Sequence, residues 1–342
     1  MSEKGLSEKK DVILDVRDLC MSFFTNKGEL PAVNHVSFQA EKGKTLGIVG
    51  ESGCGKSMTS LTVMKLFPQP PGKIVGGEIF FQGQDLNKLN EREMRKIRGK
   101  GIAMIFQEPM TSLNPVLTIG KQLIEQIRVH EKVSKAEAKE RALEMIRLVN
   151  IPMPEKIYAS YPHQLSGGMR QRIMIAMALS CHPELLICDE PTTALDVTVQ
   201  AQVLSLINKL KEETNTAVML ITHDMGVINE MADKVLVMYA GQVVETAETA
   251  ELFAHPSHPY TTGLIQSIPR LDEEVDKLHV IKGSVPMLYE LPKGCLFAPR
   301  CQYACGICNE QRPDLVDLGN GHTCRCFKYT AHWKDDHAEE KN

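Results

Sequence analysis

The segment Gly50–Ser57, GESGCGKS, constrains the fold most, because it matches the phosphate-binding pattern G-x-x-x-x-G-K-[ST] in the required context. An apolar run, TLGIVG, ends in this segment, and a helical pattern, SMTSLTVMKLF, follows and stops before Pro68. Glycines in the segment let successive backbone N–H groups turn toward phosphate oxygens. We therefore expect a strand, a phosphate loop and a helix whose N-terminus adds a favourable dipole.

Every residue of this loop is a candidate nucleotide ligand. Lys56 is expected to reach the β- and γ-phosphates, and Ser57 is expected to hold Mg²⁺. The complete set is Gly50, Glu51, Ser52, Gly53, Cys54, Gly55, Lys56 and Ser57. The alternative is a glycine-rich turn without a ligand, which the flanking strand and helix disfavour.

The apolar runs ELLICDE at 184–190 and TAVMLITHD at 216–224 have the length and the β-branched residues of buried strands. Helical patterns lie between the apolar runs. This alternation predicts an α/β domain with a mainly parallel sheet that is covered on both faces. From Thr118 to Ile151 apolar residues recur at helical spacing among charges, which predicts an all-helical insertion.

Two carboxylates end the run LLICDE. Its apolar residues bury the strand and place Asp189 at the carboxyl end, where it can hold Mg²⁺ or the water around it. Glu190 follows at once, and adjacent strand residues point to opposite sides, so the two carboxylates need different roles. Glu190 is the candidate general base for the attacking water. Taken alone, the pair could also be a solvated acidic turn.

The segment LSGGMRQR, Leu165–Arg172, offers a second anion cradle, because Ser166, Gly167 and Gly168 stand at the expected start of a helix. Two cradles are hard to use on one nucleotide.

The order of phosphate loop, Gln107, LSGGM, LLICDEP, ALD and LITHD resembles the ATP-binding subunit of ATP-binding cassette transporters. The resemblance covers roughly Val12 to Glu251 and implies ATP and Mg²⁺ as cofactors. It implies a head-to-tail dimer in which Ser166, Gly167 and Gly168 of one subunit close over the ATP held by the other. That arrangement accounts for the second cradle.

The same resemblance assigns roles to isolated residues. Gln107 is expected near Mg²⁺ and the γ-phosphate, beside the membrane subunits, and His223 is expected to contact the γ-phosphate during catalysis. Asp196 is expected at the dimer interface. Phe23 is expected to stack on adenine, with Phe24 as the alternative.

Three segments, FQEPMTSLNPVLTIG, DEPTTALDVTVQAQ and HPSHPYTTGLIQSIP, resemble the oligopeptide, dipeptide and nickel uptake branch of that family. The branch implies an ATPase that drives import of oligopeptides or dipeptides, with nickel or another small solute as alternatives. Its usual partners are a second, different ATPase subunit, two permease subunits and an extracytoplasmic solute-binding protein.

The expected organisation follows from these motifs and from the composition of the chain. We expect a cassette domain at 12–255 with a helical subdomain at 116–164, a small cysteine-rich extension at 256–328, and polar tails at 1–11 and 329–342. No apolar run approaches the ~20 residues of a membrane span, and no signal peptide is evident, so we expect a peripheral subunit at the cytoplasmic face of the cell membrane.

Six of the ten cysteines lie between Cys295 and Cys326, and the cytosol disfavours disulfides. Residues 295–301 resemble a C-x-F-x-x-R-C segment that carries a 4Fe–4S cluster in some members of the branch. The implied ligands are Cys295, Cys301, Cys308 and Cys326, with Cys324 competing for the last position. Arg300 is expected to offset the negative charge of the cluster.

Zinc is an alternative occupant, because Cys305 and Cys308 form a C-x2-C pair. Unligated thiols are a third alternative. A different function, in DNA repair or translation, also uses this cassette. The formal net charge of −4 does not favour binding to nucleic acid, so we do not expect nucleic acid as a partner.

Overall fold

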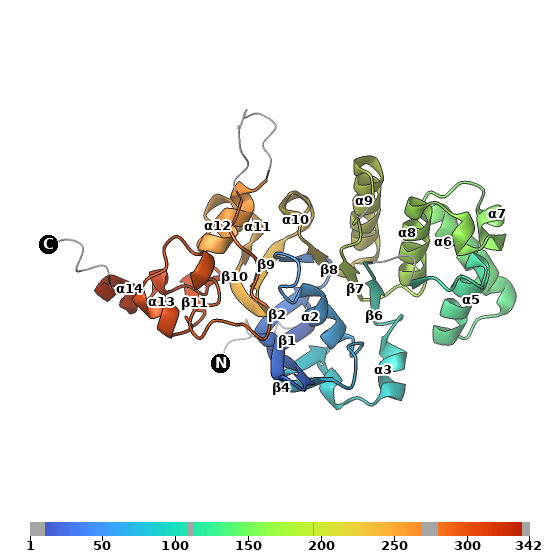
Figure 1. Cartoon of the computed structure of the whole chain (residues 1–342). Coiled ribbons are helices and arrows are strands. Elements are labelled where there is room, and N and C mark those ends of the chain that lie inside the picture. The colour runs from blue at the N-terminus through green and yellow to red at the C-terminus, as the bar shows by residue number, and fades with distance from the viewer. Residues whose placement is uncertain (1–10, 108–111, 194, 269–279, 337–342) are drawn as a thin grey trace, which may run out of the picture. The chain divides into compact units, whose positions relative to one another are not determined.

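The computed structural model describes residues 11–107, 112–193, 195–268 and 280–336, which are coloured in Figure 1. They fall into two compact units. The phosphate-loop unit consists of residues 15–39, 46–80 and 222–336, and the insertion unit consists of residues 11–14, 40–45 and 81–221. Each unit is described by itself.

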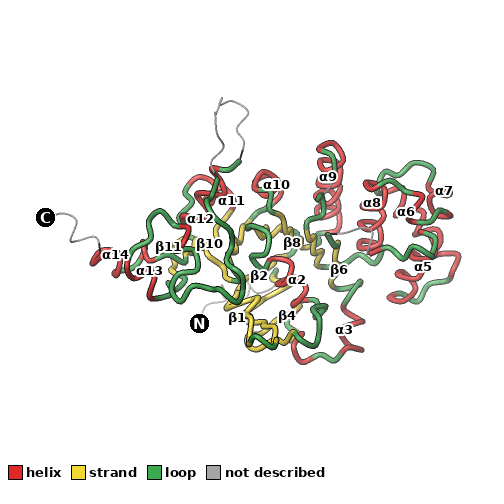
Figure 2. Tube along the Cα trace, viewed as in Figure 1, coloured by secondary structure: helices red, strands yellow, loops and turns green. Residues whose placement is uncertain are grey.

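Strands and helices follow one another along the chain as Figure 2 shows. The strands are β1 (Val12–Thr25), β2 (Gly28–Glu41), β3 (Thr45–Val49), β4 (Gly72–Phe81), β5 (Gln84–Asp85), β6 (Ile102–Ile105), β7 (Leu185–Asp189), β8 (Ala217–Thr222), β9 (Lys234–Tyr239), β10 (Gln242–Glu248), β11 (Val316–Gly319) and β12 (His322–Cys324). The α-helices are α2 (Lys56–Val63), α3 (Glu91–Ile97), α5 (Ile119–His130), α6 (Lys135–Leu148), α7 (Pro154–Ala159), α8 (Gly167–Leu179), α9 (Val197–Thr214), α10 (Met225–Met231), α11 (Thr249–Ala254), α12 (Pro259–Gln266), α13 (Gly306–Glu310) and α14 (Ala331–Asp336). The 3-10 helices are η1 (Leu86–Lys88), η2 (Pro162–Gln164), η3 (Ala298–Arg300) and η4 (Phe327–Tyr329).

The phosphate-loop unit is built on strands in the order β11-β12-β10-β9-β3. Strand β3 runs parallel to β9, with Leu46 opposite Lys234. Every residue of β3 is buried, as expected for an apolar strand covered on both faces. Strands β9, β10, β12 and β11 pair antiparallel. Strand β12, near the C-terminus, therefore lies beside β10, and β10 separates it from β9.

A second sheet contains β2, β1 and β4 as neighbours in that order. The apolar runs in the sequence did not predict these strands. Strand β1 alternates irregularly between buried and exposed residues, and Asp18 and His35 interrupt the extended backbone with φ values of 49° and 53°. Because such left-handed residues shift which face a side chain occupies, the strict period of two that identifies a half-buried strand is lost.

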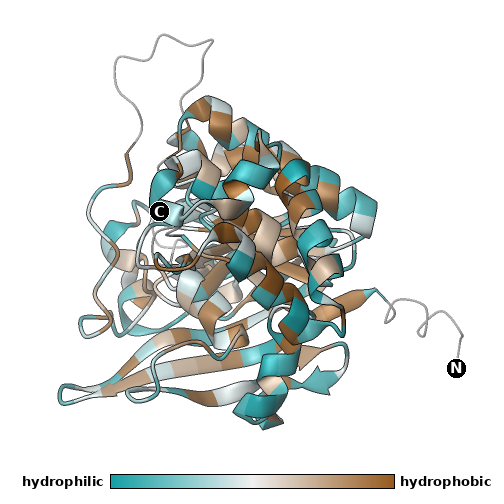
Figure 3. Cartoon of the chain, turned by 90° about the vertical axis from the view of Figure 1, so that its right-hand side faces the viewer, coloured by the Kyte–Doolittle hydropathy of each residue, from teal (hydrophilic) through white to brown (hydrophobic). Residues whose placement is uncertain are grey.

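In the insertion unit β6, β7 and β8 are parallel neighbours, and all their residues are buried. Helices α5 and α6 follow the pattern predicted from Thr118 to Ile151. Thr118 and Ser134 cap α5 and α6 by accepting hydrogen bonds from backbone N–H groups three residues on. Ile119, Leu123 and Ile127 form the buried stripe of α5. Figure 3 shows the resulting mixture of hydrophilic and hydrophobic residues along the helices.

The α/β fold and the three expected strands are confirmed, and two details of the prediction are wrong. The sheets are mixed rather than mainly parallel, because β10, β12 and β11 add antiparallel strands. The helix after the phosphate loop ends at Val63 instead of continuing to Phe67. Lys65 has a φ of 50°, which a continuing right-handed helix does not allow.

The C-terminal segment is joined to the phosphate-loop unit by backbone pairing and by a buried carboxylate. Cys324 lies opposite Glu245 in the β12–β10 ladder. Glu245 is fully buried and accepts hydrogen bonds from the backbone N–H groups of Ser257 and His258 and from His322 Nε2. None of the helices within the described ranges combines the length and the apolar character needed to cross a membrane.

Candidate functional site

The phosphate loop connects β3 to α2 and has the backbone that its glycines allow. Gly50, Gly53 and Gly55 have φ values of 151°, 81° and 102°. A Cβ at position 50 would lie 2.3 Å from the carbonyl oxygen of Met238, and one at position 55 would lie 2.8 Å from that of Ala32. Both the dihedral angles and the close packing against neighbouring backbone therefore require glycine.

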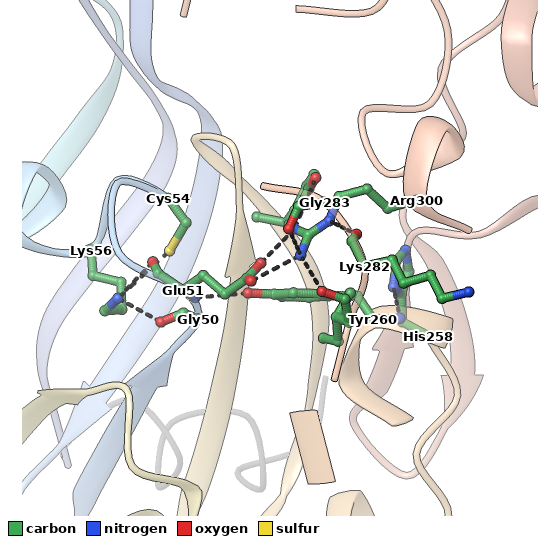
Figure 4. Close-up of polar contacts among 11 residues, drawn as sticks. Gly50, Glu51, Cys54, Lys56, His258, Tyr260, Lys282, Gly283 and Arg300 are labelled. Carbon is green, nitrogen blue, oxygen red and sulfur yellow. Dashed lines mark hydrogen bonds and ion pairs between the residues drawn. The ribbon is translucent and has the colours of Figure 1, made fainter. Parts of the chain in front are cut away.

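Lys56 lies at the centre of this loop and is buried. Its ammonium donates hydrogen bonds to the carbonyl oxygens of Gly50 at 2.6 Å and Glu51 at 3.0 Å (Figure 4). The Cys54 thiol lies 3.8 Å away from Lys56 Nζ, is buried, and has its pKa raised by that burial. A buried cation inside a ring of backbone groups suits an anionic ligand.

Glu51 is held from two directions by residues of the C-terminal part of the chain. Its backbone N–H donates to the hydroxyl oxygen of Tyr260 over 2.7 Å. Its carboxylate forms a two-pronged ion pair with Arg300, at 2.5 Å and 2.9 Å (Figure 4). Arg300, which the sequence predicted would offset the charge of a cluster, thus contacts the phosphate loop.

The carboxylates expected at the end of β7 lie in the insertion unit. Asp189 is the last residue of β7 and is buried. Glu190 has left the strand with a φ of 47°, a strained backbone of the kind often found at functional sites. Glu190 Oε2 accepts hydrogen bonds from Gln107 Nε2 at 2.8 Å and from Thr193 Oγ1 at 2.9 Å. Gln107 and Glu190 are therefore brought together as a polar pair.

The second anion cradle is an ordinary capped helix start. Ser166 is the N-cap of α8 and accepts a hydrogen bond from the backbone N–H of Met169 at 3.3 Å. Gly167 has open space where a Cβ would be, and one at Gly168 would lie 3.1 Å from Val199. Asp196 caps α9 in the same way, by accepting from the Val199 N–H at 2.9 Å. Both helix starts leave backbone N–H groups for an anion.

Phe23 and His223, two further expected residues, belong to the phosphate-loop unit. Phe23 is half-buried near the end of β1, and Phe24 is 48% exposed. His223 is exposed in the turn between β8 and α10. The alanine of the ALD motif, at position 194, and residues 108–111 of the segment after Gln107 lie outside the described residues.

Four cysteines near the C-terminus line one pocket, and they are the four that the sequence singled out. Cys295, Cys301, Cys308 and Cys326 surround it with Phe297, Ala298 and Phe327 among its other walls. Burial raises the pKa of Cys295 and Cys301, and it raises that of Cys326 to about 12. Neither Cys305 nor Cys324 is a lining residue.

No three His, Cys, Asp or Glu side chains within the described ranges are arranged to hold a metal ion. Neither the 4Fe–4S cluster nor the zinc alternative therefore has a preformed metal site in this part of the chain.

Comparison with known proteins identifies the family. The ABC transporter profile matches residues 33–193, and the profile of the oligopeptide/dipeptide transporter C-terminal region matches residues 244–308. A probable peptide ABC transporter ATP-binding protein of Sinorhizobium fredii is 54% identical over 94% of this chain and 96% of its own length. The chain belongs to the ABC transporter family. The resemblance drawn from the motifs is thereby confirmed, and with it the ATPase activity of ABC transporter ATP-binding proteins.

Other relatives of this ABC protein span it almost completely. An oligopeptide transport ATP-binding protein of Bacillus subtilis is 54% identical over 93% of the chain and 97% of its own length. One of Salmonella typhimurium is 50% identical over 93% and 94%. Among solved structures, a dimeric ATP-binding cassette in a post-hydrolysis state with ADP and phosphate is 27% identical, with a TM-score of 0.63 over 69% of this chain and 98% of that one.

Three contacts of this ABC protein were missed by the sequence. Thr193 touches Glu190, and its position three residues after that carboxylate is a signal that could have found it. Tyr260 and Arg300 reach Glu51 across 209 and 249 positions. No spacing rule links residues so far apart, so only the fold reveals these contacts.

Proposed function

We propose that this ABC ATPase is the energy-coupling subunit of a membrane importer for oligopeptides or dipeptides. The main support is that the matched oligopeptide/dipeptide transporter C-terminal region includes Tyr260 and Arg300. These two residues contact Glu51 and so attach that region to the phosphate loop. The names of the full-length relatives support peptides as the solute. Nickel or another small solute is the alternative within this branch.

In this proposal ATP binds with its phosphates in the loop Gly50–Ser57, and Phe23 stacks on adenine. Lys56 neutralises the β- and γ-phosphates. Ser57 and Asp189 hold Mg²⁺, and the choice fits because the hydroxyl and carboxylate oxygens of this pair are the ligands that Mg²⁺ prefers. The bound Mg²⁺ supplies charge neutralisation between the phosphate groups.

Glu190 is the proposed general base, which orients the attacking water and takes its proton. The hydrogen bonds from Gln107 and Thr193 support this role, because they fix the position of one carboxylate oxygen of Glu190. Gln107 and His223 contact the γ-phosphate in this scheme. The transition state is stabilised by charge and position rather than by covalent chemistry.

Hydrolysis requires a second ATPase subunit. In the proposed head-to-tail dimer, Ser166, Gly167 and Gly168 of one subunit close over ATP in the other, and Asp196 lies at the interface. The capped start of α8 supports this, since its free N–H groups favour an anion. The partner is a different ATPase in the usual assembly, with two permease subunits and an extracytoplasmic solute-binding protein, and the chain sits at the cytoplasmic face of the membrane.

We further propose a 4Fe–4S cluster held by Cys295, Cys301, Cys308 and Cys326. The four thiols line one pocket, and a cubane requires one thiolate for each iron. Cys326 is favoured over Cys324 as the fourth ligand, because only Cys326 lines the pocket. The cluster itself supplies electron-transfer or structural chemistry when bound.

The function is tested by expressing the chain with permease and solute-binding proteins of the proposed assembly and reconstituting that assembly in liposomes. Uptake of a labelled oligopeptide that depends on ATP and is abolished by Lys56→Ala is expected. Failure to copurify with membrane proteins, together with ATPase activity stimulated by DNA or ribosomes, would contradict the proposal and favour the repair or translation alternative.

A further inference from the structure

Glu51 is the point at which the C-terminal part of the chain meets the phosphate loop. Tyr260, the first of the two residues that hold it, is fully buried and accepts the backbone N–H of Glu51. Arg300, the second, binds both carboxylate oxygens. Figure 4 shows Glu51 between Lys56 on one side and Arg300 and Tyr260 on the other. One loop residue is thus fixed through its main chain and through its side chain.

Arg300 is itself rigidly placed. Its side chain is 4% exposed, and its Nε donates to the carbonyl oxygen of Lys282 at 2.9 Å. Its terminal nitrogens also reach the carbonyl oxygen of Gly283 at 3.2 Å and the hydroxyl of Tyr239 at 3.4 Å. The ion pair with Glu51 raises the pKa of Arg300. A guanidinium whose three nitrogens are all bonded cannot turn away from Glu51 without leaving buried donors unpaired.

An aromatic cluster supports both contacts. The Tyr239 ring packs edge-on against Tyr260 and Phe297, with ring centroids 4.8 Å and 5.2 Å apart. Phe297 also lies against Tyr260, at 5.4 Å. These rings restrict the Tyr260 side chain to a narrow range of positions, so its hydroxyl remains aimed at the loop.

The charge of Glu51 makes this arrangement significant for ligand binding. The loop must receive polyanionic phosphates, and Glu51 carries a negative charge within that loop. Without a partner the carboxylate would repel the ligand, because two like charges near a partly dry site interact strongly. Its side chain is 31% exposed, so water alone does not screen it completely.

We propose that Arg300 is a positioning residue of the nucleotide site, which neutralises Glu51 and holds the phosphate loop in its binding conformation, with Tyr260 as the second point of attachment. The proposal rests on nucleotide binding by this loop. It goes beyond the transport function, because it makes the C-terminal extension a working part of the ATP site.

The test is a double-mutant cycle on the full chain, with MgADP affinity measured by calorimetry. Wild-type binding, abolished by Lys56→Ala, first establishes that the loop binds nucleotide, so a failure there counts against the nucleotide site and not against Arg300. Arg300→Met is expected to weaken MgADP binding roughly tenfold, the size typical of a lost charged hydrogen bond. In a Glu51→Gln background, Arg300→Met is expected to change the affinity little, since no carboxylate is left to neutralise.

Two further measurements separate this role from a merely structural one. The loss caused by Arg300→Met is expected to shrink as salt rises, because screening weakens the repulsion by Glu51. Arg300→Lys is expected to keep part of the MgADP affinity, because lysine retains the positive charge but cannot bind both carboxylate oxygens of Glu51 through two nitrogens. Arg312→Ala is the control, because Arg312 is exposed and lies in the same C-terminal part.

Equal losses from Arg300→Met in both backgrounds would overturn the proposal, as would wild-type affinity in Arg300→Met. If Arg300→Met does not fold, the MgADP affinities of Tyr260→Phe and Arg300→Lys test the proposal instead. Each is expected to weaken MgADP binding, and wild-type affinity in both would overturn the proposal.

Discussion

Gln107 and Glu190 are 83 positions apart in the chain, and the Nε2 of Gln107 donates a 2.8 Å hydrogen bond to Oε2 of Glu190. The amide is exposed, while the carboxylate follows a buried strand and has a left-handed backbone. A residue that faces solvent is thus tied directly to the proposed base. Thr193 donates a hydrogen bond to the same oxygen, so the carboxylate is held at Oε2 by two side chains.

Glu190→Gln is expected to abolish hydrolysis and to leave MgATP affinity unchanged. An amide cannot take the proton of the attacking water, and general base catalysis contributes about 100- to 10,000-fold. Steady-state ATPase measurement on the assembled transporter checks this. Glu212→Gln, at an exposed position of α9, is the control. Activity near that of the wild type would remove Glu190 from its role.

Thr193→Val is expected to lower kcat roughly tenfold with little effect on KM. The substitution keeps the shape of the side chain and deletes the hydroxyl that donates to Glu190 at 2.9 Å, a charged hydrogen bond of about 1.5 kcal/mol. ATPase assays of Thr193→Val and Thr193→Ser give the comparison, since serine retains the hydroxyl. A loss of the same size in both variants would contradict a role for the hydrogen bond.

Stability is expected to fall in acid because of His258. Burial lowers the pKa of this fully enclosed imidazole to about 3, and Nδ1 accepts the Tyr260 N–H. In the unfolded chain His258 takes up a proton near pH 6.5. The stability that buried, neutral His258 contributes is therefore complete above pH 6.5 and is lost as the pH falls toward 3. At pH 5 the loss is about 2 kcal/mol. Denaturant titrations of the wild type and His258→Asn test this.

Asparagine is the matched variant, because its side-chain oxygen can cap α12 without binding a proton in this range. A shallower loss of stability between pH 6.5 and 4 is expected in His258→Asn. Identical pH profiles would show that other groups cause the acid sensitivity.

Glu245→Gln is expected to lower the free energy of unfolding by about 2 kcal/mol. The carboxylate is fully buried among donors, and an amide nitrogen in place of one oxygen would face a donor N–H or His322 without an acceptor. Glu248→Gln, at an exposed position of the same strand, is expected to change little. Equal stabilities of the two variants by urea denaturation would refute the importance of this carboxylate.

Iron content is expected to depend on Cys326 and not on Cys305. Protein purified without oxygen should contain iron and acid-labile sulfide, and Cys326→Ser should lose most of both because a thiolate ligand is missing. Cys305→Ser should retain them, since Cys305 does not line the pocket. A colourless wild type with neither iron nor sulfide would exclude the cluster, and zinc in that sample would favour the other metal.

The central strands and the phosphate loop could be predicted because their signal is local. TLGIV, LLICD and AVMLIT are apolar except for one polar residue at an end, as suits strands buried on both faces. Their observed and predicted limits differ by at most two residues at either end. Strands β1 and β2 carry no such signal. Their charged residues and the left-handed Asp18 and His35 break the alternation, and their pairing is decided by the sheet.

The candidate site divides in the same way. The residues from Gly50 to Ser57 form the expected loop because glycine and the buried lysine impose it locally. Arg300 illustrates the limit. Its neighbour Cys301 suggested a cluster as its partner, whereas the fold delivers the guanidinium to Glu51. Which acid a distant arginine meets depends on tertiary packing, which no local pattern encodes.

The distance along the chain between Glu51 and Arg300 also has a consequence for biosynthesis. The 249 positions between them take roughly 10–50 s to translate at about 5–20 residues per second. Throughout that interval a nascent chain can display the phosphate loop without the arginine that neutralises it. Under the proposed role of Arg300, high-affinity ATP binding is therefore expected only once Arg300 has been translated, and a ribosome-bound chain that stops before it is expected to bind nucleotide more weakly.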